Sequence, residues 1–136
     1  MAVTTISNDT ARHFMDTVAL TADTTLTAAD SGKVFFLDAT GEEILLPAVG
    51  VSAGVKYKFI VTAAVAVSSW TIVATTAKIY GQVVEAGLVQ LAAAETTITL
   101  VHTSKATIGD WLTLESDGTN WYVAGQFAVA ASFTTA

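Results

Sequence analysis

The stretch that decides the fold is DWLTLESDGTNWYV, which occupies residues 110–123. Leu112 and Leu114 share one face of its first half, and the residues on either side of them point the other way. A run of turn-forming residues, Ser-Asp-Gly-Thr-Asn, separates this half from a second apolar segment, Trp-Tyr-Val. The stretch therefore predicts a β-hairpin.

A second segment has the same period of two. Tyr57, Phe59 and Val61 share one face, and Lys56 and Lys58 lie on the other. Val, Ile and Thr, whose branched side chains favour strands, supply 45 of the 136 residues. Further strands are predicted at Lys33–Leu37, Glu43–Leu46, Val55–Val61, Trp70–Ala74, Lys78–Tyr80, Thr96–His102 and Phe127–Phe133. For Gly87–Glu95 a strand is favoured by context and a short helix by propensity.

Turns recur about every ten residues, as in sandwiches and small barrels. The predicted fold is therefore all-β: one compact β-sandwich or small barrel over residues 26–136. Residues 1–25 hold few bulky apolar side chains and are predicted to be an extended N-terminal arm, with a strand at His13–Leu20. A chain of this length buries enough surface to fold without metals or disulfides.

Composition excludes several classes of function. The net charge is −6 and the pI is about 4.5, so a nucleic-acid partner is not expected. The chain has no Cys, its most apolar run is too short to cross a bilayer, and its start lacks a basic signal region. Synthesis in the cytoplasm and no membrane partner are therefore expected. Only 13% of residues are charged and 52% are hydrophobic, which favours an extensive subunit interface over an alanine-rich monomer.

No catalytic, metal or cofactor site is expected. The only histidines, His13 and His102, lie in no recognisable motif, and two histidines without Cys cannot form a zinc centre. Acidic residues gather near residues 38–43 and 110–117, but without the alternation of a calcium loop, so turn-forming Asp and solvated Glu are the preferred interpretation. Three Trp and three Tyr leave a sugar-binding platform open, although core or interface packing is favoured. Alternation along the hairpin predicts that Trp121 and Tyr122 point to opposite faces, with one ring in the core.

Three segments resemble the small virion proteins of tailed bacteriophages: LTAADSG at residues 26–32, GVKYKFIV at 54–61 and GDWLTLESDGTNWYV at 109–123. Similar segments occur in capsid decoration proteins, also called head-stabilising or cement proteins. The resemblance implies a compact β-sandwich or β-tulip-like barrel domain that forms a homotrimer. It also implies a non-enzymatic role on the outer capsid surface, synthesis in the bacterial cytoplasm, and the major capsid protein as partner. Similar endings occur in tail and fibre domains, so the alternative is a receptor-binding module for host glycans. A free-standing carbohydrate-binding domain is the third interpretation.

The arm is the predicted capsid-attachment element. Its candidate contact residues are the isolated apolar anchors Ile6, Phe14 and Met15 and the cationic pair Arg12 and His13. A polar, Thr-rich segment with so few anchors cannot bury enough surface to fold alone. It can gain order by adding a strand to the sheet edge of a capsid protein or of a neighbouring subunit.

Overall fold

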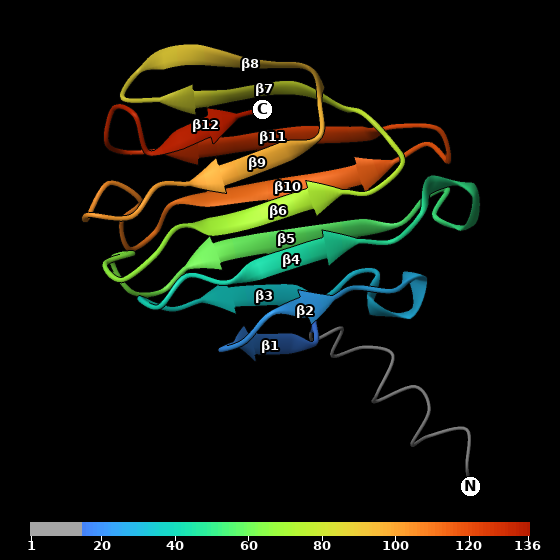
Figure 1. The fold of residues 1–136 in the computed structure, drawn as a ribbon, viewed down its shortest axis with the longest axis horizontal. Coiled ribbons are helices and arrows are strands. Elements are labelled where there is room, and N and C mark those ends of the chain that lie inside the picture. Colours follow the sequence, from blue (N-terminus) through green and yellow to red (C-terminus); the bar gives the residue numbers. More distant parts are fainter. Residues whose placement is uncertain (1–14) are drawn as a thin grey trace, which may run out of the picture.

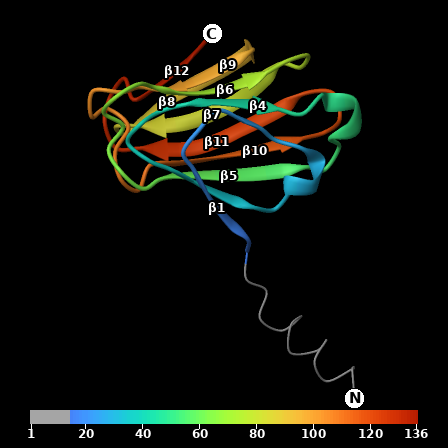
Figure 2. The same cartoon turned by 60° about the horizontal axis from the view of Figure 1, so that its bottom comes forward.

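The computed structural model describes residues 15–136, which form two β-sheets packed face to face (Figures 1 and 2). Two short 3-10 helices, η1 (Ala28–Asp30) and η2 (Val49–Val51), lie in the connections. The strands of the described residues are β1 (Thr17–Leu20), β2 (Thr24–Thr25), β3 (Val34–Leu37), β4 (Glu43–Leu46), β5 (Lys56–Val61), β6 (Trp70–Ala74), β7 (Ile79–Glu85), β8 (Leu88–Glu95), β9 (Thr97–Leu100), β10 (Trp111–Ser116), β11 (Trp121–Phe127) and β12 (Phe133–Thr135). The predicted all-β class is confirmed, and the architecture is a β-sandwich.

The larger sheet has seven strands in the order β1-β3-β5-β10-β11-β7-β8, and the smaller has five in the order β12-β9-β6-β4-β2. Figure 2 shows the two sheets as layers, with β5, β10 and β11 in one and β4, β6 and β9 in the other. Both sheets are mixed: β1, β3 and β5 run parallel, whereas β10 is antiparallel to both of its neighbours. β1 and β8 are the two edges of the larger sheet.

The hairpin expected from residues 110–123 is confirmed as β10 and β11, which pair antiparallel with Leu114 opposite Val123. Leu112 and Leu114 are buried, as the alternation predicts. Trp121 is fully buried, whereas Tyr122, the next residue, is exposed. The two rings therefore lie on opposite faces of the sheet, as predicted.

Aromatic rings fill the space between the sheets. The Tyr57 ring stacks on Trp121 with centroids 5.7 Å apart, and Phe35 stacks on Phe59 at 5.4 Å. Trp70 from the smaller sheet is also fully buried, and its indole N–H donates to the carbonyl oxygen of Asp38 at 3.0 Å. Each large apolar side chain buried in this way stabilises the fold by about 1.5–3 kcal/mol.

Two of the further strands predicted from the sequence differ from the structure by more than two residues at an end. β7 does not end at Tyr80 but continues to Glu85, because Gly81 lies inside the strand and not in a turn. Gly81 has a φ of +131°, and a Cβ atom there would lie 2.1 Å from the carbonyl oxygen of Val123 on β11. Its missing side chain lets the two strands approach.

The strand predicted at Phe127–Phe133 is also wrong. Phe127 ends β11 and Phe133 begins β12, and the residues between them turn the chain from the larger sheet to the smaller one. Ala131 has a φ of +60°, which a strand residue does not adopt. The sequence between Phe127 and Phe133 resembles a strand because two aromatic residues flank a run of small ones.

Gly87–Glu95 is a strand and not a helix, since Leu88–Glu95 forms β8. Residues 17–25, assigned to the arm from the sequence, hold β1 and β2, one in each sheet. The sandwich therefore includes residues that precede position 26. Of the strand predicted at His13–Leu20, the part from Thr17 onward is observed as β1.

Candidate functional surfaces

Met15 is the only predicted arm-contact residue that the structure describes; Ile6, Arg12, His13 and Phe14 lie outside the described residues. Met15 is exposed just before β1 and lines a hollow of about 90 Å³. The charged side chains lining this hollow are Lys33, Lys56, Lys58 and Glu115. The point where residues 1–14 join the sandwich is therefore next to a surface hollow rich in lysine.

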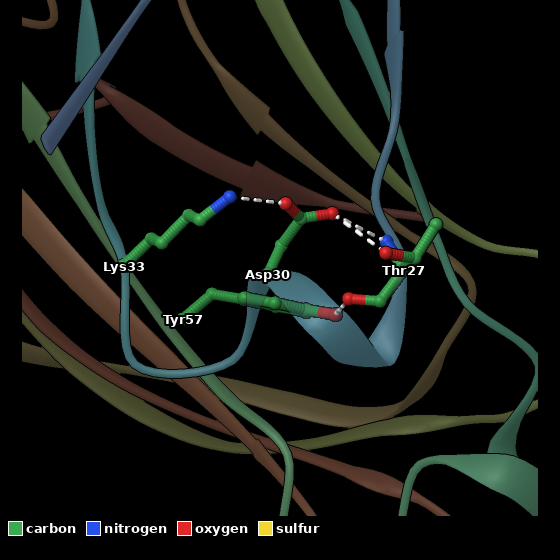
Figure 3. A network of polar contacts seen from close by, with 4 residues as sticks. All are labelled: Thr27, Asp30, Lys33 and Tyr57. Atoms are coloured by element: carbon green, nitrogen blue, oxygen red, sulfur yellow. Dashed lines mark hydrogen bonds and ion pairs between the residues drawn. The ribbon is translucent and has the colours of Figure 1, made fainter. Parts of the chain in front are cut away.

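A network of hydrogen bonds among Thr27, Asp30, Lys33 and Tyr57 lies next to this hollow (Figure 3). One oxygen of Asp30 accepts hydrogen bonds from the backbone N–H and the hydroxyl of Thr27, both at 2.9 Å. Its other oxygen accepts from the Lys33 ammonium at 2.7 Å. The Tyr57 hydroxyl donates to the Thr27 carbonyl oxygen at 2.6 Å. The network fixes η1, which connects the smaller sheet to the larger one, against a core strand.

The charges of this network shift the pKa values of its members. The hydrogen bond from Lys33 lowers the pKa of the Asp30 carboxyl, and the Thr27 backbone N–H lowers it further. The same bond to Asp30 raises the pKa of Lys33. Burial, with the nearby Asp30 charge, raises the pKa of Tyr57 to about 12. All three groups are therefore held in their usual charge states at neutral pH, as a structural network requires.

A second, larger hollow of about 340 Å³ lies where β10 begins and β11 ends, and Trp111 and Gln126 line it together with Ile108. The Lys58 ammonium lies 5.4 Å from the centroid of the Trp111 ring, a cation–π contact. The Asp110 carboxylate is buried there and accepts from the backbone N–H groups of Thr107 and Ala128. Asp110 therefore joins the loop that precedes β10 to the segment that follows β11.

The other two Asp residues predicted to form turns, Asp38 and Asp117, accept hydrogen bonds from the backbone of their own turns. Asp38 accepts the backbone N–H of Thr40 at 2.8 Å, and Asp117 accepts those of Thr119 and Asn120 at 2.7 and 2.8 Å. The backbone N–H of Asn120 in particular lowers the pKa of Asp117. The prediction of turn-forming Asp in both acidic clusters is confirmed. Within residues 15–136, no three His, Asp or Glu side chains are placed to hold a metal ion together.

The structure brings His102 and Ser69 together, a pair that the sequence did not suggest because 33 positions separate them. The Ser69 hydroxyl lies 2.9 Å from Nδ1 of His102, and its oxygen also accepts the backbone N–H of His102 at 3.1 Å. These bonds connect the residue before β6 to the segment that follows β9.

The Trp and Tyr side chains divide into two groups. Trp70, Trp121 and Tyr57 are buried in the core. Trp111, Tyr80 and Tyr122 lie on the outer face of the larger sheet. Tyr80 and Tyr122 are exposed neighbours with ring centroids 6.5 Å apart. Core packing therefore accounts for three of the six Trp and Tyr side chains, and Tyr80 and Tyr122 form an exposed pair on the surface.

Exposed apolar side chains gather at the other edge of the larger sheet, on β7 and β8. They are Val84, Leu88, Val89 and Leu91, and Tyr80 lies next to them on β7. This edge lies opposite the hollow at Met15, because β8 and β1 are the two ends of the strand order (Figure 1).

No helix in the described part of the chain is both long and apolar enough to span a membrane. Comparisons with protein-family models, with curated protein sequences and with solved structures found no match to this chain.

Proposed function

We propose that this chain is a non-enzymatic structural protein of a tailed-phage virion, which binds the outside of the capsid as a homotrimer and stabilises the shell. It is made in the cytoplasm of the bacterial host, and its partner is the major capsid protein. The proposal combines the resemblance of three segments to decoration proteins with the position at which the N-terminal segment joins the sandwich.

The observation that carries the proposal is the pairing of β1 with β3. Thr17 lies opposite Val34 and Leu20 opposite Leu37, so β1 is fixed at the edge of the larger sheet. Residues 1–14 are joined to the sandwich at this edge through Met15. A segment joined there can add its backbone hydrogen bonds to a neighbouring sheet while the sandwich remains outside the shell.

The hollow beside Met15 supplies a second contact for the same partner. Lys33, Lys56 and Lys58 line it, and Arg12 and His13 precede it in the chain. These groups suit acidic side chains on the capsid surface, although the whole chain is acidic, with a net charge of −6. Attachment through this edge leaves the opposite edge of the sheet for contacts between copies.

Stabilisation of the shell follows from linkage. A protein that binds the assembled capsid but not its separated subunits shifts the equilibrium toward assembly, by an amount that grows with its concentration above the dissociation constant. No chemical step is needed for this activity. A rigid sandwich with a well-packed core is suited to it, since little binding energy is lost in ordering the domain.

The test is removal of residues 1–14. The deletion must stop there, because a cut after Leu20 would also remove β1 from the sheet. Binding is measured to capsids of the phage that encodes this chain, prepared without it. We expect the truncated protein to melt like the full chain and to bind these capsids much more weakly. Equal binding by both proteins would contradict attachment through the arm, and no binding by the full chain would contradict the function itself.

The second candidate is a tail or fibre module that binds host glycans, and the exposed pair of Tyr80 and Tyr122 favours it. Sugar rings stack on exposed aromatic faces. The Trp121 ring is buried and cannot contact a glycan, so the informative variant is Tyr122→Ala. Glycan binding by the full chain that is lost in this variant, at an unchanged melting temperature, would favour the receptor-binding function.

A further inference from the structure

β8 differs from the other edge strands of the sandwich. It has eight residues, whereas β1, β2 and β12, the other edges that the described chain forms, have four, two and three. A long edge strand exposes a row of backbone N–H and C=O groups to which another chain can bind. Short edges offer little of this kind, so among the edges that residues 15–136 form, β8 alone presents such a row over several residues.

β8 is apolar on both of its faces. Val89 and Leu91 point to the outer face of the larger sheet and are 58% and 67% exposed. Leu88 lies opposite Glu85 in the strand pairing, so both side chains point to the inner side of the sheet. The Glu85 side chain is buried there, but Leu88 is 68% exposed. The smaller sheet therefore does not cover the end of β8, and Figure 1 shows β8 beyond the last strands of that sheet.

Residues 80–94, which form most of β7 and β8, expose no charged side chain. Between Tyr80 and Ala94 the only ionisable groups are the hydroxyl of Tyr80 and the carboxylate of Glu85, which is buried and bonded to Ser132 and Phe133. Exposed edge strands are usually protected from association by Lys, by Pro or by an inward-pointing charge. Before Ala94, the exposed part of β8 has none of these protections.

We propose that a second copy of this chain covers this surface. We call it the β8 face and define it by Tyr80, Val84, Val89 and Leu91 on the outer side of the larger sheet, together with Leu88 on the inner side of the same edge. The inference deepens the proposed function and rests on it for the number of copies: in a homotrimer the β8 faces of the three copies would lie beside the threefold axis, where equivalent surfaces come together.

Charge is the first argument for a second copy. Two chains that each carry a net charge of −6 repel, and they can approach best where neither presents a charged side chain. The β8 face also offers no counter-charge to a nucleic acid or to a strongly charged protein. Its apolar side chains complement those of an identical face.

Area is the second argument. The five side chains of the β8 face expose on the order of 300 Å² of apolar surface, from the usual areas of such side chains and their exposed fractions. A stable interface buries about 800 Å² on each partner. The exposed Ala93 and Ala124 and the free edge of β8 extend this patch toward that size. Small ligands bind in concave pockets, whereas an exposed sheet edge can pair with another protein chain.

The test compares two valine substitutions in the full chain. Val89→Glu places a carboxylate in the β8 face, and Val67→Glu places one on a valine that is at least as exposed, in the loop between β5 and β6. We expect sedimentation equilibrium to show self-association of the wild type and of Val67→Glu, and association roughly 10-fold weaker or more in Val89→Glu. Melting temperatures check folding, and Leu91→Ser is the second variant if Val89→Glu does not fold.

Hydrogen exchange gives an independent measurement, since the backbone N–H groups of β8 should become protected as wild-type concentration rises. Association of Val89→Glu or, failing that, of Leu91→Ser at the wild-type strength would overturn the inference. A wild-type chain that stays monomeric at every concentration would also overturn it. If such a monomer still bound capsids, the decoration function would stand without the β8 contact. Association that depends on Val89, in a chain that does not bind capsids, would support the contact and contradict the decoration function.

Discussion

The Tyr57 hydroxyl and the Thr27 carbonyl oxygen are 2.6 Å apart, and this hydrogen bond joins a fully buried core residue to the turn that connects the two sheets. Tyr57 also stacks on Trp121. One side chain therefore connects the hairpin of β10 and β11, the strand β5 and the helix η1.

Replacement of Tyr57 by Phe removes this hydrogen bond and keeps the stacked ring. We expect a loss of about 1 kcal/mol in the free energy of unfolding at neutral pH, because the Thr27 carbonyl loses its partner. Chemical denaturation of both proteins measures the difference. A variant as stable as the wild type would show that the bond contributes nothing.

The same pair of proteins tests the pKa of Tyr57. The folded protein keeps the hydroxyl proton up to a pKa of about 12, whereas an unfolded chain releases it near 10. Between these values the folded state binds more protons, so the stability contributed by Tyr57 falls as the pH rises from about 10 toward 12. We expect wild-type stability to fall more steeply than that of Tyr57→Phe over this range. Parallel curves would contradict the raised pKa.

The two tryptophans that flank the hairpin should differ in their effect on stability. Trp121 is fully buried, and Trp121→Ala should cost about 3–5 kcal/mol. Trp111 is half-buried on the outer face beside Lys58, so Trp111→Ala should cost clearly less. Denaturation curves of the two variants provide the comparison, and equal losses would be inconsistent with the two environments.

Glu85 connects the sheets from a buried position. One carboxylate oxygen accepts the backbone N–H groups of Ser132 and Phe133, both at 2.7 Å, and the Ser132 hydroxyl at 3.2 Å. Glu85→Ala leaves these donors unsatisfied and should cost about 3 kcal/mol. Glu85→Gln keeps an acceptor oxygen and is the control, with a smaller loss expected. The prediction fails if alanine and glutamine are tolerated equally.

Gly81→Ala should destabilise the protein severely. The added Cβ would meet the Val123 carbonyl oxygen, and the φ of +131° is unsuited to alanine. Gly50→Ala is the control, because its Cβ would have open space around it. We expect normal yield and melting temperature only for Gly50→Ala. Similar behaviour of the two variants would contradict the close approach of β7 to β11.

Local patterns predicted much of this fold because strand alternation is a local property. Val55–Val61 and the hairpin strands were recognised from their period of two, and the opposite environments of Trp121 and Tyr122 followed from it. The errors at Gly81 and at Phe127–Phe133 arose where a distant partner decides the structure. Gly81 looks like a turn residue until β11 is placed beside it. The strand order and the Ser69–His102 pair likewise depend on contacts that no local pattern contains.

The candidate surfaces were less predictable than the fold. The isolation of Met15 in a polar segment marks it as a candidate contact. The hollow beside it is lined by Lys33, Lys56 and Lys58, which come together only when the strands pair. The apolar surplus indicated an interface without locating it. Leu88 and Leu91 became candidates only when β8 was found at an edge that the smaller sheet leaves uncovered.

An electron-microscopy map of the phage particle that carries this protein tests the decoration function most directly. We expect trimeric density on the outer capsid surface, into which the sandwich fits with the β1 edge and Met15 toward the shell and the β8 faces toward one another. Density for the sandwich on the tail or its fibres, with none on the capsid, would contradict the decoration function.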